Sequence, residues 1–351
     1  MPPKGRHTTS HEVDIKAPAE LVYRIVADAA DWPQRFVPTV HVERTGLGAG
    51  AERLEIWATG NGEVKHWTSR RELDPAARRV EFRQEVSSPP VASMGGTWIV
   101  SQEPNGVTRL VLEHDFEAVD DDPEGVEWIT KATDRNSTTE LGNIKALAEG
   151  WDRLAELTFS FEDSVVVDGS PEEVYDFLYR ADLWPERLPH VASMKFAEGE
   201  PGVQEMAMET RTKDGSTHTT ESVRVCFPTG RIVYKQLVPP SLMTAHLGEW
   251  TFTAEGEGRV RATSRHTVTV KEDAITTVLG DGATVETAKE FIRKAAGGNS
   301  VATLNLAKEF VEARTSEART SEARTSEART GEARTGEART GEARTGEARN
   351  G

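Results

Sequence analysis

The chain has 351 residues, enough for two domains and an extra segment, and its hydrophobic share of 36% is ordinary for a soluble globular protein. Its formal net charge of −16 excludes nonspecific nucleic-acid binding, which needs a basic surface. No apolar run could span a bilayer or act as a secretion signal. The single cysteine, Cys226, excludes an intrachain disulfide and fits a reducing, cytoplasmic location.

The first half of the chain begins with a strand and a helix, and then continues as several strands. A strand is predicted near His11–Ile15 and a helix over Pro18–Ala29, because proline suits the first turn of a helix. Trp32-Pro33 is expected to end this helix, since a residue before proline avoids helical angles. Turn signals rich in glycine then separate the strands that follow.

The end of this half contains its clearest hairpin and its clearest helix. Asn105-Gly106 lies between Thr97–Gln102 and Val107–Phe116, a pattern typical of two antiparallel strands joined by a tight turn. A long helix is predicted over Thr133–Leu157, where apolar residues recur at helical spacing. An antiparallel sheet that curls around this helix would enclose a pocket.

The second half of the chain repeats the pattern of the first. Matching anchors are offset by 152 or 153 residues, and the offset rises to 163 at the final helix, so extra residues enter the second copy before that helix. The anchors are Pro18 with Pro171, Trp32 with Trp184, Arg79–Gln84 with Arg231–Gln236, Trp98 with Trp250, His114 with His266, and Asn136 with Asn299. The second copy is expected to have a strand at Ser164–Val167, a helix over Pro171–Arg180 and a long helix over Val285–Val311.

These elements predict an α+β protein with two tandem helix-grip domains, each a curved antiparallel sheet wrapped around a long C-terminal helix with an internal pocket. The first domain is expected over residues 1–158 and the second over residues 159–311. Residues 312–351 are eight Glu-Ala-Arg pentads, and a period of five suits neither a helix nor a strand. This tail has almost no apolar content, so it is predicted to be solvated and disordered.

One predicted strand carries polar residues at the same positions in both copies. Trp67, Ser69 and Arg71 share a face because side chains alternate along a strand, and Ser222 and Arg224 match the last two. A buried arginine is costly unless it serves a function, so both arginines are candidates for polarising carbonyl or enolate oxygens. The alternative is an arginine on the outer face, or in an ion pair at the strand end.

Histidines and asparagines also recur in both copies. His114 and His266 are candidate acid–base groups, although a lone histidine is more often structural. Asn136 and Asn299, near the long helices, either orient the substrate or cap a helix. Ordinary core packing is the alternative role for the candidate pocket walls. These walls are Trp32, Phe36, Trp67, Met94 and Trp98 in the first copy, and Trp184, His246 and Trp250 in the second.

The common motifs of other enzyme classes do not occur. The sequence has no GxGxxG after a strand, no GxxxxGKS/T, no HExxH and no GxSxG. The nine histidines show no metal-ligand spacing. The sequence therefore gives no reason to expect a nucleotide cofactor, a metal site or an acyl-enzyme mechanism.

Four segments together resemble the polyketide aromatase/cyclases of bacterial type II polyketide synthases, which belong to the Bet v 1/START-like superfamily. The segments are His66–Pro75, Ser93–Trp98, His114–Phe116 and Arg135–Ser137. The resemblance covers residues from about 8 to 311 in two copies, as in the two-domain members of this family. It implies regiospecific C7–C12 aldol closure of the first ring, dehydrative aromatisation, or both, on a poly-β-ketone, with or without earlier C9 ketoreduction.

The resemblance also implies partners and residue roles. The polyketide would be tethered to an acyl carrier protein, and the partners would be synthase subunits, including a ketoreductase, without a cofactor, nucleic acid or membrane. Arg71 would stabilise the oxyanion, His114 would protonate the leaving hydroxyl, and Ser69 and Asn136 would orient water or substrate. The matching residues of the second copy, Ser222, Arg224, His266 and Asn299, are expected to act in a second pocket.

The two copies are not expected to act equally. In the second copy Thr220 stands in place of Trp67, His246 in place of Met94, and Leu188 in place of Phe36, so its pocket is predicted to be less aromatic and more polar. Our hypothesis assigns ring closure or aromatisation to the first pocket, and dehydration or a structural role to the second. Two alternatives stay open, namely a non-catalytic START-like carrier of lipids or other hydrophobic ligands, and a scaffold for synthase subunits.

Overall fold

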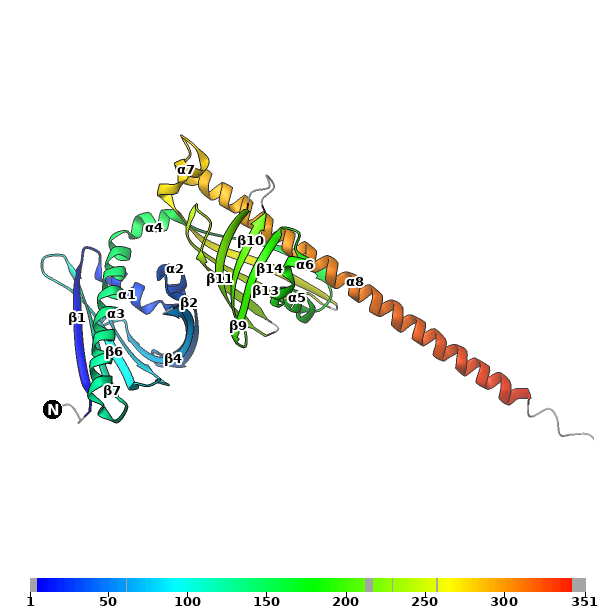
Figure 1. Cartoon of the computed structure of the whole chain (residues 1–351), viewed down its shortest axis with the longest axis horizontal. Coiled ribbons are helices and arrows are strands. Elements are labelled where there is room, and N and C mark those ends of the chain that lie inside the picture. The colour runs from blue at the N-terminus through cyan, green and yellow to red at the C-terminus, as the bar shows by residue number, and fades with distance from the viewer. Residues whose placement is uncertain (1–4, 61, 212–216, 229, 257, 343–351) are drawn as a thin grey trace, which may run out of the picture.

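The computed structural model describes residues 5–60, 62–211, 217–228, 230–256 and 258–342, with side chains as far as Glu317. Figure 1 shows two similar halves, each a curved sheet packed on a long helix, with the last helix projecting far beyond the second sheet. Among the described residues, no helix is both long and apolar enough to cross a membrane.

The elements of the first half follow the predicted order. They are β1 (His7–Ile15), α1 (Ala19–Ala27), η1 (Ala29–Asp31), α2 (Trp32–Arg35), β2 (Thr39–Gly48), β3 (Ala51–Gly60), β4 (Glu63–Asp74), β5 (Arg79–Gln84), β6 (Val91–Gln102), β7 (Thr108–Ala118), η2 (Val119–Asp121), α3 (Pro123–Glu149) and α4 (Trp151–Leu157). The seven strands form one antiparallel sheet in the order β1-β7-β6-β5-β4-β3-β2, so the first and last strands in sequence are neighbours. The predicted hairpin is confirmed as the β6–β7 connection.

The second half repeats this arrangement. Its elements are β8 (Thr158–Asp168), α5 (Pro171–Tyr179), η3 (Ala181–Leu183), α6 (Trp184–Arg187), β9 (Val191–Glu200), β10 (Val203–Arg211), β11 (Thr217–Phe227), β12 (Arg231–Val238), β13 (Met243–Ala254), β14 (Arg259–Val270), η4 (Glu272–Ala274), α7 (Ile275–Leu279) and α8 (Val285–Glu342). The sheet order is β8-β14-β13-β12-β11-β10-β9, which matches the first sheet strand for strand. The short helix α7 occupies the extra residues that the changing offset predicted.

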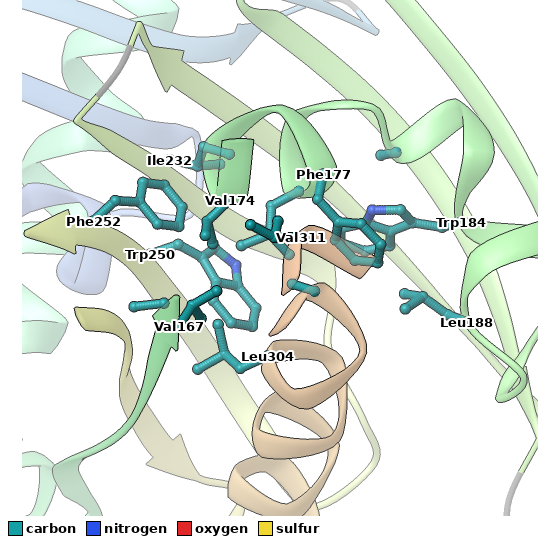
Figure 2. Close-up of a cluster of buried hydrophobic side chains, with 14 of the residues drawn as sticks. Val167, Val174, Phe177, Trp184, Leu188, Ile232, Trp250, Phe252, Leu304 and Val311 are labelled. Atoms are coloured by element: carbon teal, nitrogen blue, oxygen red, sulfur yellow. The ribbon is translucent and has the colours of Figure 1, made fainter. Parts of the chain in front are cut away.

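Each sheet packs its inner face, the face toward the long helix, against apolar residues of that helix. In the first half Leu141, Ile144 and Ala148 of α3 pack with Leu110 and Leu112 of β7. In the second half, Figure 2 shows Leu304 and Val311 of α8 among the side chains of the main core cluster. The apolar faces of the helix and the sheet therefore pack together in the main core cluster of each half.

Three predictions about the helices are wrong. Trp32-Pro33 and Trp184-Pro185 do not end a helix; each begins a short helical turn, because proline is accommodated at the first helical positions. The helix α3 begins at Pro123 rather than Thr133, since Asp122 accepts a hydrogen bond from the Gly125 amide at 2.8 Å and so caps it.

The expectation of a disordered tail is also wrong for most of the pentads. The helix α8 continues from the packed core through residues 312–342 (Figure 1). Glu, Ala and Arg have high helix propensity, and a helix that is already nucleated propagates easily through such residues. The last residues, 343–351, lie outside the described part of the chain.

Candidate functional site

The arginine of β4 lies on the inner face of the first sheet and is already paired. Arg71 stands directly across from Phe82 and is 3% exposed. Its Nε donates to Glu52 Oε1 at 3.0 Å, and its Nη atoms donate to the same carboxylate and to the carbonyls of Val26 and Ala27. Burial lowers the pKa of Arg71, and the hydrogen bond to Glu52 opposes that shift. This guanidinium is therefore neutralised and held by the protein itself.

The matching arginine of β11 has far fewer partners. Arg224 is also 3% exposed, but residue 204, which corresponds to Glu52, is a glutamine. The Arg224 Nη2 donates to the Leu178 carbonyl at 2.7 Å, whereas Nε and Nη1 have no hydrogen-bond partner among the described residues. Burial lowers the pKa of Arg224, and the nearby Cys226 thiol opposes that shift. Two donor atoms of this buried arginine are thus left without an acceptor among the described residues, which is unusual for a buried polar group.

A tryptophan ring covers each arginine in the same way. The Arg71 guanidinium carbon lies 5.1 Å from the centre of the Trp32 ring, and that of Arg224 lies 5.1 Å from the Trp184 ring. These contacts are of cation–π geometry, and they fix the guanidinium planes beside the α1 and α5 helices. The duplicated Trp-Pro anchors of the sequence thus serve to hold the two arginines.

An aromatic ring lies between each arginine and the histidine three strands away in the same sheet. In the second half Tyr234 lies across from Arg224 on one side, and across from Gly248 on the other. A β-carbon on Gly248 would lie 1.9 Å from the Tyr234 ring, so only glycine leaves room for this ring. The Tyr234 hydroxyl lies 3.4 Å from Nδ1 of His266. This tyrosine is not among the site residues expected from the sequence, although it lies in the repeated Arg231–Gln236 run.

His266 is the centre of a polar network in the second half. Its Nε2 lies 2.8 Å from Ser300 Oγ and 3.1 Å from Ser264 Oγ. Its Nδ1 lies 2.9 Å from Nε2 of His246, whose Nδ1 is 2.7 Å from the Gln236 side-chain oxygen. Burial lowers the pKa of both histidines, so both rings are neutral at pH 7. The side chains from Gln236 to Ser300 therefore form one continuous hydrogen-bonded chain, whose members strengthen one another's hydrogen bonds.

The corresponding histidine of the first half has a mostly apolar setting. Burial lowers the pKa of His114 to about 4, and its Nδ1 has no hydrogen-bond partner among the described residues. Its ring makes an edge contact with Phe82, at 5.6 Å between ring centres. Phe82 and Met94 stand where the second half has Tyr234 and His246. The first half thus has an arginine, an aromatic ring and a histidine at the same positions as the second half. It lacks the tyrosine hydroxyl and the second histidine that connect these residues in the second half.

The asparagine predictions require a correction. Asn136 and Asn299 are exposed, whereas the serines that follow them, Ser137 and Ser300, are buried. On a helix one position turns a side chain through about 100°, so only one residue of each pair faces the core. Ser300 reaches His266, while the Ser137 hydroxyl has no hydrogen-bond partner among the described residues. The inward residue of the repeated Asn-Ser pair is therefore the serine.

The remaining predicted residues lie on the inner faces but do not form one wall. Trp32 and Trp67 pack together in one cluster, Phe36 and Trp98 in the main core, and Met94 beside Phe116 in a third cluster. Trp184 and Trp250 lie in the main core of the second half (Figure 2). Ser69 donates to the Arg83 carbonyl at 3.1 Å, and Ser222 is half-buried. Core packing, the alternative that the sequence left open, thus accounts for most of these aromatics.

Metal binding finds no support in the part of the chain that the structure describes. No three His, Cys, Asp or Glu side chains are grouped there as ligands for a metal ion. The polar groups of the second interior are instead an arginine, a tyrosine, two histidines and serines, which suit proton transfer and the binding of oxygen atoms.

Comparison with known proteins gives consistent results. The family described as polyketide cyclase/dehydrase and lipid transport matches the chain twice, over residues 6–149 and 158–310. The chain is 46% identical over 310 residues to a granaticin polyketide synthase bifunctional cyclase/dehydratase of Streptomyces violaceoruber, covering 88% of this chain and 95% of that protein. It is 47% identical over 313 residues to the actinorhodin polyketide synthase bifunctional cyclase/dehydratase of Streptomyces coelicolor, covering 86% and 96%.

Two solved structures are similar over most of the chain. The di-domain ARO/CYC BexL from the BE-7585A biosynthetic pathway has a TM-score of 0.81 at 52% identity, covering 87% of this chain and 99% of that one. The di-domain ARO/CYC StfQ from the steffimycin biosynthetic pathway has a TM-score of 0.79 at 35% identity, covering 88% and 99%. The similarity thus extends to the arrangement of both halves.

Proposed function

The chain belongs to the polyketide cyclase/dehydrase family in its two-domain form, and on this premise we propose that it is an aromatase/cyclase of aromatic polyketide biosynthesis. It closes the first ring of a poly-β-ketone between C7 and C12, aromatises that ring by loss of water, or does both. The substrate is tethered to an acyl carrier protein, and the synthase subunits, with a ketoreductase, are its partners.

The observation that carries the assignment of the chemistry is the difference between the two arginines. An aldol closure turns a ketone oxygen into an alkoxide, and the alkoxide needs hydrogen-bond donors. Among the described residues, two donor atoms of Arg224 have no acceptor, whereas Arg71 is held by Glu52 and two carbonyls. We therefore assign oxyanion stabilisation to Arg224 and a supporting role in the first interior to Arg71. This reverses the division of labour that the sequence suggested.

Dehydration requires a base and an acid in the same interior. One proton leaves the carbon next to the new alcohol, the hydroxyl leaves as water after gaining a proton, and a carbon–carbon double bond forms. Neutral His266 accepts the first proton at Nε2, in place of the hydrogen bond that Ser264 or Ser300 makes to that nitrogen, and the same imidazolium then protonates the leaving hydroxyl. Ser300, Ser264 and His246 fix the ring orientation through its two nitrogens. No proton is gained or lost overall, and one water is released.

The test is product profiling of a minimal polyketide synthase, with and without its ketoreductase, supplemented with wild type, Arg224→Ala or Arg71→Ala. We expect wild type to shift products from shunt compounds to a first-ring aromatic product. Arg224→Ala should lose this shift, whereas Arg71→Ala should retain it in proportion to the folded protein present. No shift with wild-type protein, together with copurified lipid, would instead favour a carrier of hydrophobic ligands.

A further inference from the structure

Strand β12 faces both halves of the molecule. Its alternate residues Ile232, Tyr234 and Gln236 point into the second interior, where Tyr234 and Gln236 contact the histidine network. The alternate residues Arg231, Val233 and Lys235 point the other way, toward the first domain. Arg231 pairs with Glu43, and Val233 packs in a cluster with Val40 and Trp57.

Lys235 lies on this outer face and is only 5% exposed. Its Nζ donates to four backbone carbonyls of the first domain, Pro33 and Phe36 at 2.8 Å, and Val37 and Thr39 at 2.9 Å. The described residues place no carboxylate in an ion pair with it. Burial lowers the pKa of Lys235 to about 8, so its ammonium form still prevails at pH 7. Three N–H groups thus serve four acceptors inside the interface.

These four carbonyls lie within the segment Pro33–Thr39, which runs from α2 through the connecting residues to the first residue of β2. A helix end leaves carbonyls without intrahelical partners, and a lysine can cap them. Here the capping lysine comes from the other domain. The segment carries Phe36, and its helical turn begins at Trp32, whose ring covers Arg71. The geometry of the first interior therefore depends on a side chain of the second domain.

In the described structure, the first half has no equivalent of the Lys235 contact, so the contact was not simply inherited through the duplication. Arg83 corresponds to Lys235 in the first half, and it is an exposed residue that donates to Asp115 at 2.7 Å. A guanidinium is planar and spreads its donors apart, whereas an ammonium directs three donors from one atom. Four carbonyls around one point fit the ammonium alone.

We propose that Lys235 is an interdomain positioning residue, which clamps the Pro33–Thr39 segment and thereby sets the position of Trp32 and Phe36 in the first interior. Because Tyr234 and Gln236 flank it on the same strand, the clamp also ties that segment to the histidine network. The clamp itself does not depend on the proposed function; its effect on cyclisation rests on that function.

Hydrogen exchange of the full-length protein tests the clamp. The variant is Lys235→Met, which keeps the side-chain length but loses the ammonium, and the control is Lys195→Met, an exposed lysine on β9 of the same sheet. The amide of Phe36 donates to the Trp32 carbonyl, and the amide of Thr39 donates to the Phe36 carbonyl. In Lys235→Met they should exchange about tenfold faster, with β9 to β14 unchanged, because local opening loses its restraint. Unchanged exchange at these amides, or equal acceleration throughout the second half, would overturn the proposal.

A second variant covers the case in which Lys235→Met does not fold. Lys235→Ala leaves space for a small cation, so added propylammonium should restore slow exchange of the segment, and propanol should not. Equal effects of the two additives, or no effect of either, would count against the clamp. Product profiling of the same proteins then separates the two proposals. Faster exchange with an unaltered product ratio would retain the clamp and refute only its role in cyclisation.

Discussion

The two halves share a backbone and a line of residues but differ in how those residues are connected. The first half has Arg71, Phe82 and His114 in line, and the second has Arg224, Tyr234 and His266. In the first line the arginine is neutralised by Glu52, and the histidine nitrogen Nδ1 has no hydrogen-bond partner in the described part of the chain. In the second line the arginine lacks a carboxylate partner in the described structure, and the histidine is hydrogen-bonded at both nitrogens.

The difference shows how few substitutions separate a structural interior from one equipped for chemistry. A buried charge without a counterion is costly, so it persists where a ligand can use it. Three replacements account for most of the contrast. They are Gln204 for Glu52, Tyr234 for Phe82 and His246 for Met94. The duplicated scaffold stays the same because its arginine, tryptophan and glycine positions are retained.

The largest expected effect is on the stability of the first half. Glu52→Gln removes the charge that neutralises buried Arg71, and breaking a buried pair in this way costs about 3–5 kcal/mol. The free energy of unfolding, from urea titration monitored by circular dichroism, checks this value. The matched variant Gln204→Leu in the second half removes no charge and should cost less. Equal losses in the two halves would contradict the comparison.

The next effect concerns turnover. Arg224→Leu removes the proposed oxyanion donors, so the rate of first-ring formation should fall about 100-fold, in line with the loss of one such donor elsewhere. The matched Arg71→Leu should lower the rate per folded molecule by less than about tenfold. Initial rates normalised to the folded fraction check both values. If Arg71→Leu lost more activity than Arg224→Leu, the assignment of roles would be reversed.

Acid pH should destabilise the protein through its buried histidines. The pKa of His114 is lowered to about 4 in the folded chain, against an ordinary value of about 6.5. Below pH 6.5 the unfolded chain takes up a proton that the folded chain does not, so stability falls as the pH drops from 6.5 toward 4. His114→Leu should flatten this dependence by about 2 kcal/mol over that range. Thermal unfolding at a series of pH values measures this dependence. If the stability of His114→Leu fell with pH as steeply as that of the wild type, the assignment would be refuted.

A carboxylate placed beside Arg224, like the one that Glu52 places beside Arg71, should inhibit catalysis in the second half. Gln204→Glu places a carboxylate where Glu52 binds Arg71, so it should occupy the free donors of Arg224. We expect turnover to fall about tenfold, with stability unchanged or raised. Gln204→Asn, which adds no charge, is the control. A Gln204→Glu enzyme with full activity would mean that the free donors of Arg224 are not used.

The smallest effect is expected from the tail. Val311 is buried in the second core, whereas Glu317, the last residue with a described side chain, is exposed. A chain that ends at Glu317 should keep its stability within about 0.5 kcal/mol, and should keep its turnover. The free energy of unfolding, obtained from thermal unfolding, checks this value. A larger loss in the truncated chain would show that the projecting part of α8 contributes to stability.

The sequence by itself determined the duplicated α+β fold, because periods of two and 3.6 residues and the repeated anchors depend only on local order. It also indicated Arg71 and Arg224, since alternation places each on the same strand face as the preceding serine, and it indicated His114 and His266, since they recur in both copies. It could not show which arginine is neutralised, because Glu52 lies 19 positions from Arg71 and only strand pairing brings them together.

Tertiary structure alone decided the remaining features of the site. Ser300 rather than Asn299 faces His266, because the orientation of α8 is set by the packing of its apolar face. Lys235 meets four carbonyls about 200 positions away along the chain, at an interface that no local pattern encodes. Hydrogen bonds and charge pairs act over a few ångströms. A sequence pattern therefore cannot identify the two partners of such a contact when only the tertiary fold brings them within that distance.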